Sequence, residues 1–260
     1  KGGVDPVNVT DGAGARAHMA AFAAAALLAR NGVEPILQFT VRDRNRLALE
    51  GELIGAPALG IPSILCLHGD DIASGDQPEA RAVNDIDSRT LMGIARALRD
   101  AGTLPSGRAV TPAPRLYIGA ADTPKDPAEG FSPDVLLAKI AAGADFFQTQ
   151  FVFDLDVFAR YLGKLVEHGI TAEAAYIVGV GPIASAKSAR WMNDNLFGVH
   201  VPEPVIARLE AAGDQGAEGA RIAAEIITGL RGMKGVAGAH IMAPRGEAAI
   251  AGVLDLLAIA

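Results

Sequence analysis

Short apolar segments alternate along this chain with longer segments in which apolar residues recur at helical spacing. The short segments are rich in apolar and β-branched residues and are followed by Gly, Asp or Pro, which is typical of strands. We expect strands over 4–10, 35–41, 62–67, 115–120, 145–151, 174–179 and 237–242. We expect helices over 19–29, 47–59, 89–101, 133–142, 156–168, 184–195, 205–212 and 217–230.

This alternation predicts an α/β fold with a parallel sheet and right-handed crossovers. Strands that are apolar throughout predict burial on both faces of the sheet. Seven strand–helix units are one short of a TIM-type (β/α)8 barrel, and a barrel without one strand would leave two unpaired edges. We therefore expect a single barrel domain over 1–260 that comprises units 2 to 8, the first βα unit being missing from this chain. A genuinely seven-stranded relative is the alternative.

Composition and charge restrict the kinds of molecule that the chain can bind. With 260 residues, 50% of them hydrophobic, the chain can bury the core of one barrel. A formal net charge of −7 argues against nucleic acid or an anionic membrane, because both select for clusters of Lys and Arg. The single cysteine, Cys66, cannot form an internal disulfide, and the apolar stretch 19–29 is too short to span a bilayer. We expect a cytoplasmic protein. The sequence leaves the oligomeric state open, with a homo-oligomer as one alternative.

Polar side chains gather where two of the expected strands end. Gln38 and Thr40 close one strand and could hydrogen-bond a planar ring, while His68, Gly69 and Asp70 follow the next strand. Ligands of parallel α/β proteins are held at the C-terminal ends of strands, so this pattern indicates an active site. The alternative for Asp70 is a helix N-cap or a structural salt bridge.

Two arginines follow the strand that contains Gln38. In one interpretation Asp43 caps the next helix and Arg42 and Arg44 are solvated. Arginine is unfavourable at a helix N-terminus, however, so an anionic ligand or a buried ion pair is the other interpretation. The glycine-rich turn 10–14 is either a plain loop or a backbone contact to a phosphate.

Further candidates lie elsewhere in the chain. A run of carboxylates could bind Mg²⁺, which keeps a metal-dependent lyase as an alternative, although we expect no metal. The run consists of Asp71, Asp76, Asp85 and Asp87. Gln150 lies in an apolar strand, where it is either a core amide or the partner of a polar ring edge. Arg245 could bind a carboxylate or lie at the surface.

Three segments together resemble the methylenetetrahydrofolate reductase family. They are QFTVRDRN, LHGDD…SGDQPEA and AGADFFQTQFVFD, at residues 38–45, 67–80 and 142–154. The resemblance implies a TIM barrel that binds FAD, takes electrons from NAD(P)H and interconverts 5,10-methylenetetrahydrofolate and 5-methyltetrahydrofolate by hydride transfer. The glutamate that serves as general acid on the first strand of that family has no counterpart in this sequence.

The resemblance also implies roles for individual residues. Asp70 would support a cationic iminium in the folate, and Gln150 and Arg245 would bind the pterin and the glutamate tail. Residues implied at the cofactor are Thr10, Gln38, Thr40, His68, Gly69, Asp70, Ala82, Ala120 and Lys139. Two alternatives stay open: a catalytically silent barrel that binds flavin or folate, and a folate one-carbon transfer enzyme without net flavin redox.

Overall fold

The computed structural model describes residues 6–244 and 246–257. Backbone contacts divide these residues into two compact units. The N-terminal unit holds residues 6–121 and 137–146, and the C-terminal unit holds 122–136, 147–244 and 246–257. Strand order follows chain order from β1 to β7.

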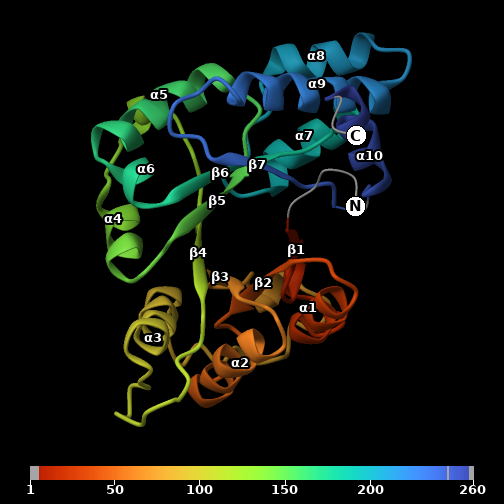
Figure 1. Cartoon of the computed structure of the whole chain (residues 1–260). Coiled ribbons are helices and arrows are strands. Elements are labelled where there is room, and N and C mark those ends of the chain that lie inside the picture. The colour runs from red at the N-terminus through yellow and green to blue at the C-terminus, as the bar shows by residue number, and fades with distance from the viewer. Residues whose placement is uncertain (1–5, 245, 258–260) are drawn as a thin grey trace. The chain divides into compact units, whose positions relative to one another are not determined.

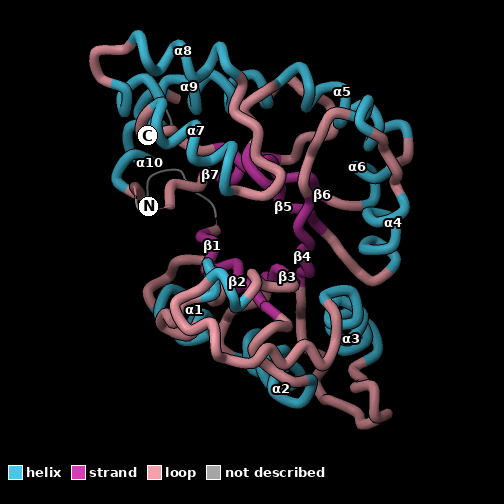
Figure 2. The backbone as a smooth tube through the Cα atoms, turned by 180° about the vertical axis from the view of Figure 1, so that it is seen from behind, coloured by secondary structure: helices cyan, strands magenta, loops and turns pink. Residues whose placement is uncertain are grey.

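Parallel strands and their connecting helices build the N-terminal unit. Its strands are β1 (Val7–Val9), β2 (Pro35–Thr40), β3 (Ser63–Leu67) and β4 (Tyr117–Asp122), whose last residue belongs to the other unit. Neighbouring strands pair in parallel from β1 to β4. The helices are α1 (Ala21–Arg30), α2 (Arg46–Ala58), α3 (Ser88–Ala101) and the end of α4 (Asp134–Ala141). Helices α1, α2 and α3 cover one side of these strands (Figures 1 and 2).

Polar side chains at the helix starts explain why α2 and α3 begin where they do. Asn45 Oδ1 accepts a hydrogen bond from the backbone N–H of Ala48 at 3.1 Å, which makes Asn45 the N-cap of α2. Asp87 Oδ1 accepts one from Thr90 at 2.7 Å and caps α3 in the same way. Each cap satisfies a donor that the first helical turn leaves unpaired.

The C-terminal unit continues the alternation. Its elements are β5 (Phe146–Phe151), α5 (Leu155–Glu167), α6 (Ile170–Glu173), β6 (Ala175–Val180), α7 (Ala186–Asn195), α8 (Glu203–Ala211), α9 (Gln215–Leu230), β7 (Gly238–Ile241) and α10 (Ala248–Leu256). Strands β6 and β7 pair in parallel, and the N–H of Val152 donates to Gly179 O at 2.8 Å, which joins the end of β5 to β6. Helix α9 packs on both β6 and β7.

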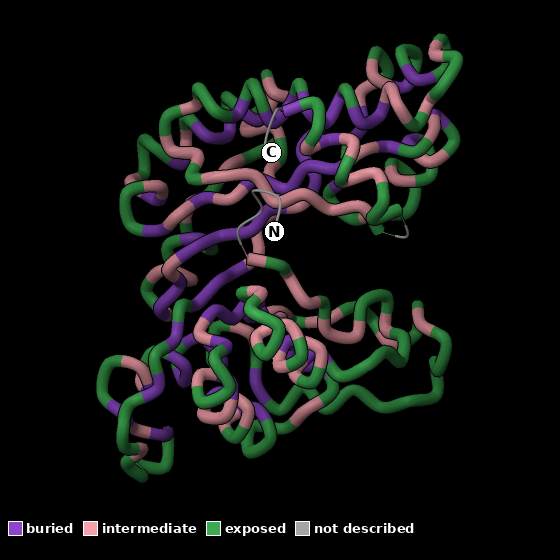
Figure 3. Tube along the Cα trace, turned by 45° about the vertical axis from the view of Figure 1, so that its right-hand side comes forward, coloured by how far each residue is buried: buried purple, intermediate pink, exposed green. Residues whose placement is uncertain are grey.

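All seven expected strands and all eight expected helices are present, with ends shifted by a few residues. The prediction missed the short helix α6 and also α10, whose segment is apolar except for Asp255 and shows little helical contrast between polar and apolar positions. Burial on both faces is confirmed for β2 and β3 (Figure 3) but is wrong for β1 and β7. Those two strands stand at the two ends of the strand order, and within the described residues each has a neighbouring strand on one side only.

Parallel strands that alternate with helices and follow chain order are the arrangement of a TIM-type barrel. The α/β fold class is therefore confirmed. Closure into an eight-stranded barrel, a missing first unit and a single domain over 1–260 stay predictions. Among the described residues, no helix has the length and apolarity needed to cross a membrane.

Candidate functional site

Arg42 joins the loops that follow β1, β2 and β3 in the N-terminal unit. Its side chain is nearly buried, with 5% of the residue exposed, and it forms two hydrogen bonds to the Asp43 carboxylate at 2.7 and 2.6 Å. Its Nη1 donates to Asp70 O at 2.9 Å and its Nη2 to Gly12 O at 3.3 Å. One guanidinium therefore holds backbone carbonyls of two other loops.

Arg44 forms a second cluster beside the first. Its guanidinium makes ion pairs with Asp11 and with Glu52 of α2, and donates to Thr40 O at 3.1 Å. Asp11 Oδ2 also accepts from both the backbone N–H and the hydroxyl of Thr40, each at 2.9 Å. The Arg44 guanidinium lies 5.5 Å from the centre of the Phe39 ring. The Arg44 guanidinium is thus paired with two carboxylates, and hydrogen bonds from Thr40 further stabilise the Asp11 carboxylate.

The ion-pair interpretation of the two arginines is therefore confirmed. Asp43 does not cap α2, because Asn45 does, and Asp43 pairs with Arg42 instead. That pairing raises the pKa of Arg42 and lowers the pKa of Asp43. Burial raises the pKa of Glu52 even though it is paired with Arg44, because loss of solvation outweighs the attraction.

Asp70 presents its carboxylate to solvent at the end of the loop after β3. Its Oδ2 accepts a hydrogen bond from the backbone N–H of Gly14 at 2.7 Å, which fixes the loop after β1 against it. His68 and Thr10, which the sequence placed at the same site, are also exposed. Beside them lie the guanidiniums of Arg42 and Arg44 with four carboxylates, so that negative charges outnumber positive charges within this group. The carboxylates belong to Asp11, Asp43, Glu52 and Asp70. This excess of negative charge favours a cationic group over an anionic one.

The remaining predicted cofactor residues of the N-terminal unit differ in accessibility. Gln38 is half-buried and its Oε1 accepts from the Asp11 N–H at 3.3 Å, while Thr40 is buried in the Arg44 cluster. Gly69 is half-buried, Ala82 is exposed and Ala120 is buried in β4. Lys139 of α4 donates from Nζ to Ala121 O at 2.6 Å, which places its ammonium beside the end of β4.

Gln150 belongs to the C-terminal unit and is half-buried, so it is not the core amide of the first interpretation. Its Oε1 accepts from the N–H of Phe151 at 3.0 Å, and its Nε2 donates to Phe197 O at 3.2 Å. The buried glutamine of this strand is Gln148, 5% exposed, whose Oε1 has no hydrogen-bond partner within the described part of the chain. Arg245 lies outside the described residues.

Sequence analysis missed a buried acid–hydroxyl cluster in the C-terminal unit. The hydroxyls of Tyr161 and Tyr176 both donate to Asp122 Oδ2, the first at 2.9 Å. The N–H of Thr123 donates to the other carboxylate oxygen at 2.8 Å. Burial and the nearby Asp122 raise the pKa of both tyrosines. The available signal was an aspartate at the end of an apolar strand, the same signal that drew attention to Asp70.

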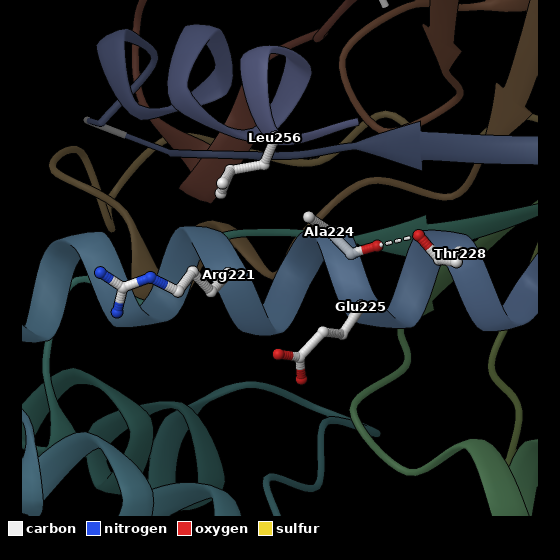
Figure 4. Close-up of a pocket in the computed structure, with 5 residues that line it drawn as sticks. All are labelled: Arg221, Ala224, Glu225, Thr228 and Leu256. Atoms are coloured by element: carbon white, nitrogen blue, oxygen red, sulfur yellow. Dashed lines mark hydrogen bonds between the residues drawn. The ribbon is translucent and has the colours of Figure 1, made fainter. Parts of the chain in front are cut away.

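Two further features bear on other sites: a surface pocket and the run of acidic residues. The pocket lies between α9 and α10, where Thr228 Oγ1 donates to Ala224 O at 2.8 Å (Figure 4). Its lining residues are Arg221, Ala224, Glu225, Thr228 and Leu256, and none of these was predicted for the site. Within residues 6–244 and 246–257, no three His, Cys, Asp or Glu side chains gather closely enough to bind a metal.

Fold and site together define a parallel α/β protein of the TIM-barrel type, with charged and polar side chains at the C-terminal ends of its strands. A family model described as methylenetetrahydrofolate reductase matches residues 2–258. The chain therefore belongs to the methylenetetrahydrofolate reductase family, which confirms the resemblance carried by the three sequence segments.

A curated relative agrees with this assignment. Over 204 residues the chain is 26% identical to "Methylenetetrahydrofolate reductase 2" of Schizosaccharomyces pombe. The aligned region covers 77% of this chain and 31% of the relative. The chain thus spans about a third of the length of that protein.

Proposed function

We propose that this chain interconverts 5,10-methylenetetrahydrofolate and 5-methyltetrahydrofolate by hydride transfer, with FAD as cofactor and NAD(P)H as electron donor. The observation that carries the proposal is the family match over residues 2–258. The excess negative charge around Asp70 supports it, because opening the folate ring creates a cation. We place the reaction in the cytoplasm, in keeping with a single cysteine, Cys66, that is buried in β3.

The residues at the ends of β1, β3 and β4 fit a flavin. Thr10, His68 and Asp70 are exposed and carry hydrogen-bonding side chains for a polar ring edge. The family resemblance assigns the contact with the diphosphate to Lys139 of α4, whose ammonium lies beside the end of β4. When bound, FAD would supply the hydride that reduces the folate carbon.

Asp70 has the setting of an electrostatic catalyst. Its carboxylate is anchored on one side by Gly14 N–H, and its backbone carbonyl is held by Arg42, so the charge is fixed in place before substrate arrives. A fixed negative charge stabilises a cation that develops in the substrate and costs no reorganisation during the reaction. We assign Asp70 to support the N5-iminium of the opened folate ring.

Gln150 is assigned to the pterin. A carboxamide has two N–H donors and two acceptor lone pairs, and the hydrogen bonds to Phe197 and Phe151 use one of each. One donor and one acceptor therefore match the polar edge of a pterin. Arg245 would pair with the glutamate tail, a role that rests on the sequence alone.

Half-reaction kinetics test the proposal. Asp70→Asn should slow folate reduction by about 10- to 1,000-fold, the range for loss of one preorganised electrostatic group. Reduction of the flavin by NAD(P)H should change much less, because no iminium forms in that step. The exposed Asp76 is the matched control, and Asp76→Asn should leave both half-reactions unchanged.

Three results would contradict the proposal. Purified protein without a flavin band and without stabilisation by added FAD would exclude the cofactor. Flavin-loaded protein that reduces no folate would indicate a silent binding protein or a one-carbon transfer enzyme instead. Equal losses in both half-reactions of Asp70→Asn would make Asp70 a structural residue.

A further inference from the structure

We propose that Gln148 is a second pterin-binding residue, whose Oε1 accepts a hydrogen bond from an N–H group of the ring; the inference rests on the proposed function. Gln148 lies in β5, two residues before Gln150. It is 5% exposed, and its Oε1 has no hydrogen-bond donor among the residues that the structure describes. A buried amide oxygen without a donor is costly, and native proteins keep few of them. The Gln148 amide is therefore suited to a donor that a ligand brings.

The two glutamines of β5 share one face of the strand. Side chains alternate between the two faces, so Gln148 lies on the same side as Gln150, and Phe147 and Thr149 lie on the other side. That other side packs against β6. The Phe147 ring centre is 6.0 Å from that of Tyr176, and the Thr149 hydroxyl accepts a hydrogen bond from a backbone N–H of β6 at 2.8 Å. The face with the glutamines is thus the one left for a ligand.

The Gln150 amide does not satisfy Gln148. Gln150 Oε1 accepts from the N–H of Phe151 at 3.0 Å, and Gln150 Nε2 donates to Phe197 O at 3.2 Å. Packing does not account for the Gln148 amide either, because an apolar side chain of the same length would fill the space without burying an unpaired acceptor. The benefit of an amide at this position therefore lies in binding rather than in the stability of the strand.

A reduced pterin has the chemistry that an unpaired acceptor requires. It carries N–H donors on its exocyclic amino group and on its ring nitrogens, whereas the oxidised isoalloxazine ring of a flavin carries one N–H. Gln150 lies near the C-terminal end of β5, and Gln148 lies about 7 Å deeper along the strand. A ring that Gln150 binds at the strand end would therefore meet Gln148 with its buried edge. A ligand without a donor at that edge would leave the Gln148 oxygen unpaired and would bind more weakly.

Calorimetric titration of the FAD-loaded chain with 5-methyltetrahydrofolate tests this inference. Gln148→Met keeps the length of the side chain and removes the amide, so the dissociation constant should rise about 5- to 100-fold. Gln148→Leu should give a similar rise, and neither variant should change the dissociation constant for FAD. The melting temperature of both ligand-free variants should equal or exceed that of the wild type, because an unpaired buried acceptor has been removed.

Thr149→Val is the matched control for stability. Thr149 is as buried as Gln148, at 4% exposure, but its hydroxyl is bonded, so this variant should lower the melting temperature.

Three results would overturn the inference and leave the proposed function standing. The first is an unchanged dissociation constant for 5-methyltetrahydrofolate in Gln148→Met. The second is a rise in the dissociation constant for FAD alone, which would place the hydrogen bond on the flavin. The third is a melting temperature of Gln148→Met as low as that of Thr149→Val, which would mean that a buried water already satisfies the amide. A wild-type chain that binds no 5-methyltetrahydrofolate would overturn both the inference and the proposed function.

Discussion

Replacing Gly12 with alanine should destabilise the protein by displacing the Arg42 side chain. Gly12 has a φ of +58°, and a Cβ there would lie 2.5 Å from Arg42 Nη2, too close for both to keep their positions. The end of an arginine side chain usually moves away at little cost. Here it is nearly buried and is held by hydrogen bonds to Asp43, Asp70 and Gly12 itself.

The expected loss in free energy of unfolding follows from a comparison with Gly14, a glycine with a similar backbone conformation. Gly14 has a φ of +65°, but no atom lies within 4 Å of a Cβ placed there. Gly14→Ala should therefore lower the free energy of unfolding only through the strained backbone, by about 1 kcal/mol once the reduced entropy of the unfolded chain is included. Gly12→Ala adds the loss of charged hydrogen bonds at about 1.5–3 kcal/mol each. Because Asp43 is half exposed and water can replace part of its bonding, one such loss is the better estimate. The total is about 3 kcal/mol.

Equilibrium unfolding in urea measures both variants on the same scale, provided that the slopes against urea agree. Gly12→Ala should lose about 2 kcal/mol more free energy of unfolding than Gly14→Ala. Equal losses would refute the reasoning, since they would mean that Arg42 moves freely and does not hold the three loops together.

Two further predictions concern the C-terminal unit. Burial lowers the pKa of His240 to about 4, so between about pH 6.5 and pH 4 this side chain is protonated in the unfolded chain but neutral in the folded chain. The free energy of unfolding should therefore fall by up to about 3 kcal/mol as the pH drops through this range. Urea unfolding at pH 7 and pH 4.5 should show a smaller drop in His240→Phe than in the wild type, and an equal drop would assign the loss to other groups. Tyr176→Phe should cost about 1.5–3 kcal/mol at pH 7 in the same assay, because it removes a buried hydrogen bond to the Asp122 carboxylate while keeping the ring; no change would mean that water replaces the hydroxyl.

Sequence periodicity predicted the order and type of nearly every element, because the strands are short apolar runs and most helices have a polar face. It failed for the four-residue α6 and for α10, in which apolar residues also lie on the outside; Leu256 is 53% exposed. For the site, spacing correctly placed Arg42, Arg44 and Asp70 after two strands. Which carboxylate each arginine would meet depended on Asp11 and Glu52, and no local rule links residues so far apart in sequence.

The neighbourhood of Gln150 was beyond sequence reasoning for a related reason. The resemblance of segment 142–154 to the family singled out Gln150, but it could not show that the amide of this residue donates to the backbone carbonyl of Phe197, 47 positions later. Every residue has a backbone carbonyl, so the residue type does not reveal which carbonyl accepts a hydrogen bond from a given side chain.

The contacts of Arg44 restrict which substitutions the sequence can accept during evolution. It binds Asp11 from the loop after β1, the carbonyl of Thr40 in β2 and Glu52 from α2, so three successive segments share one positive charge. Neutralising Arg44 alone would leave two carboxylates facing each other without a cation, and neutralising Asp11 alone would leave the Thr40 hydroxyl and N–H without their acceptor. These positions should therefore be inherited as a group, and descendants that lose one member should carry a compensating change at another.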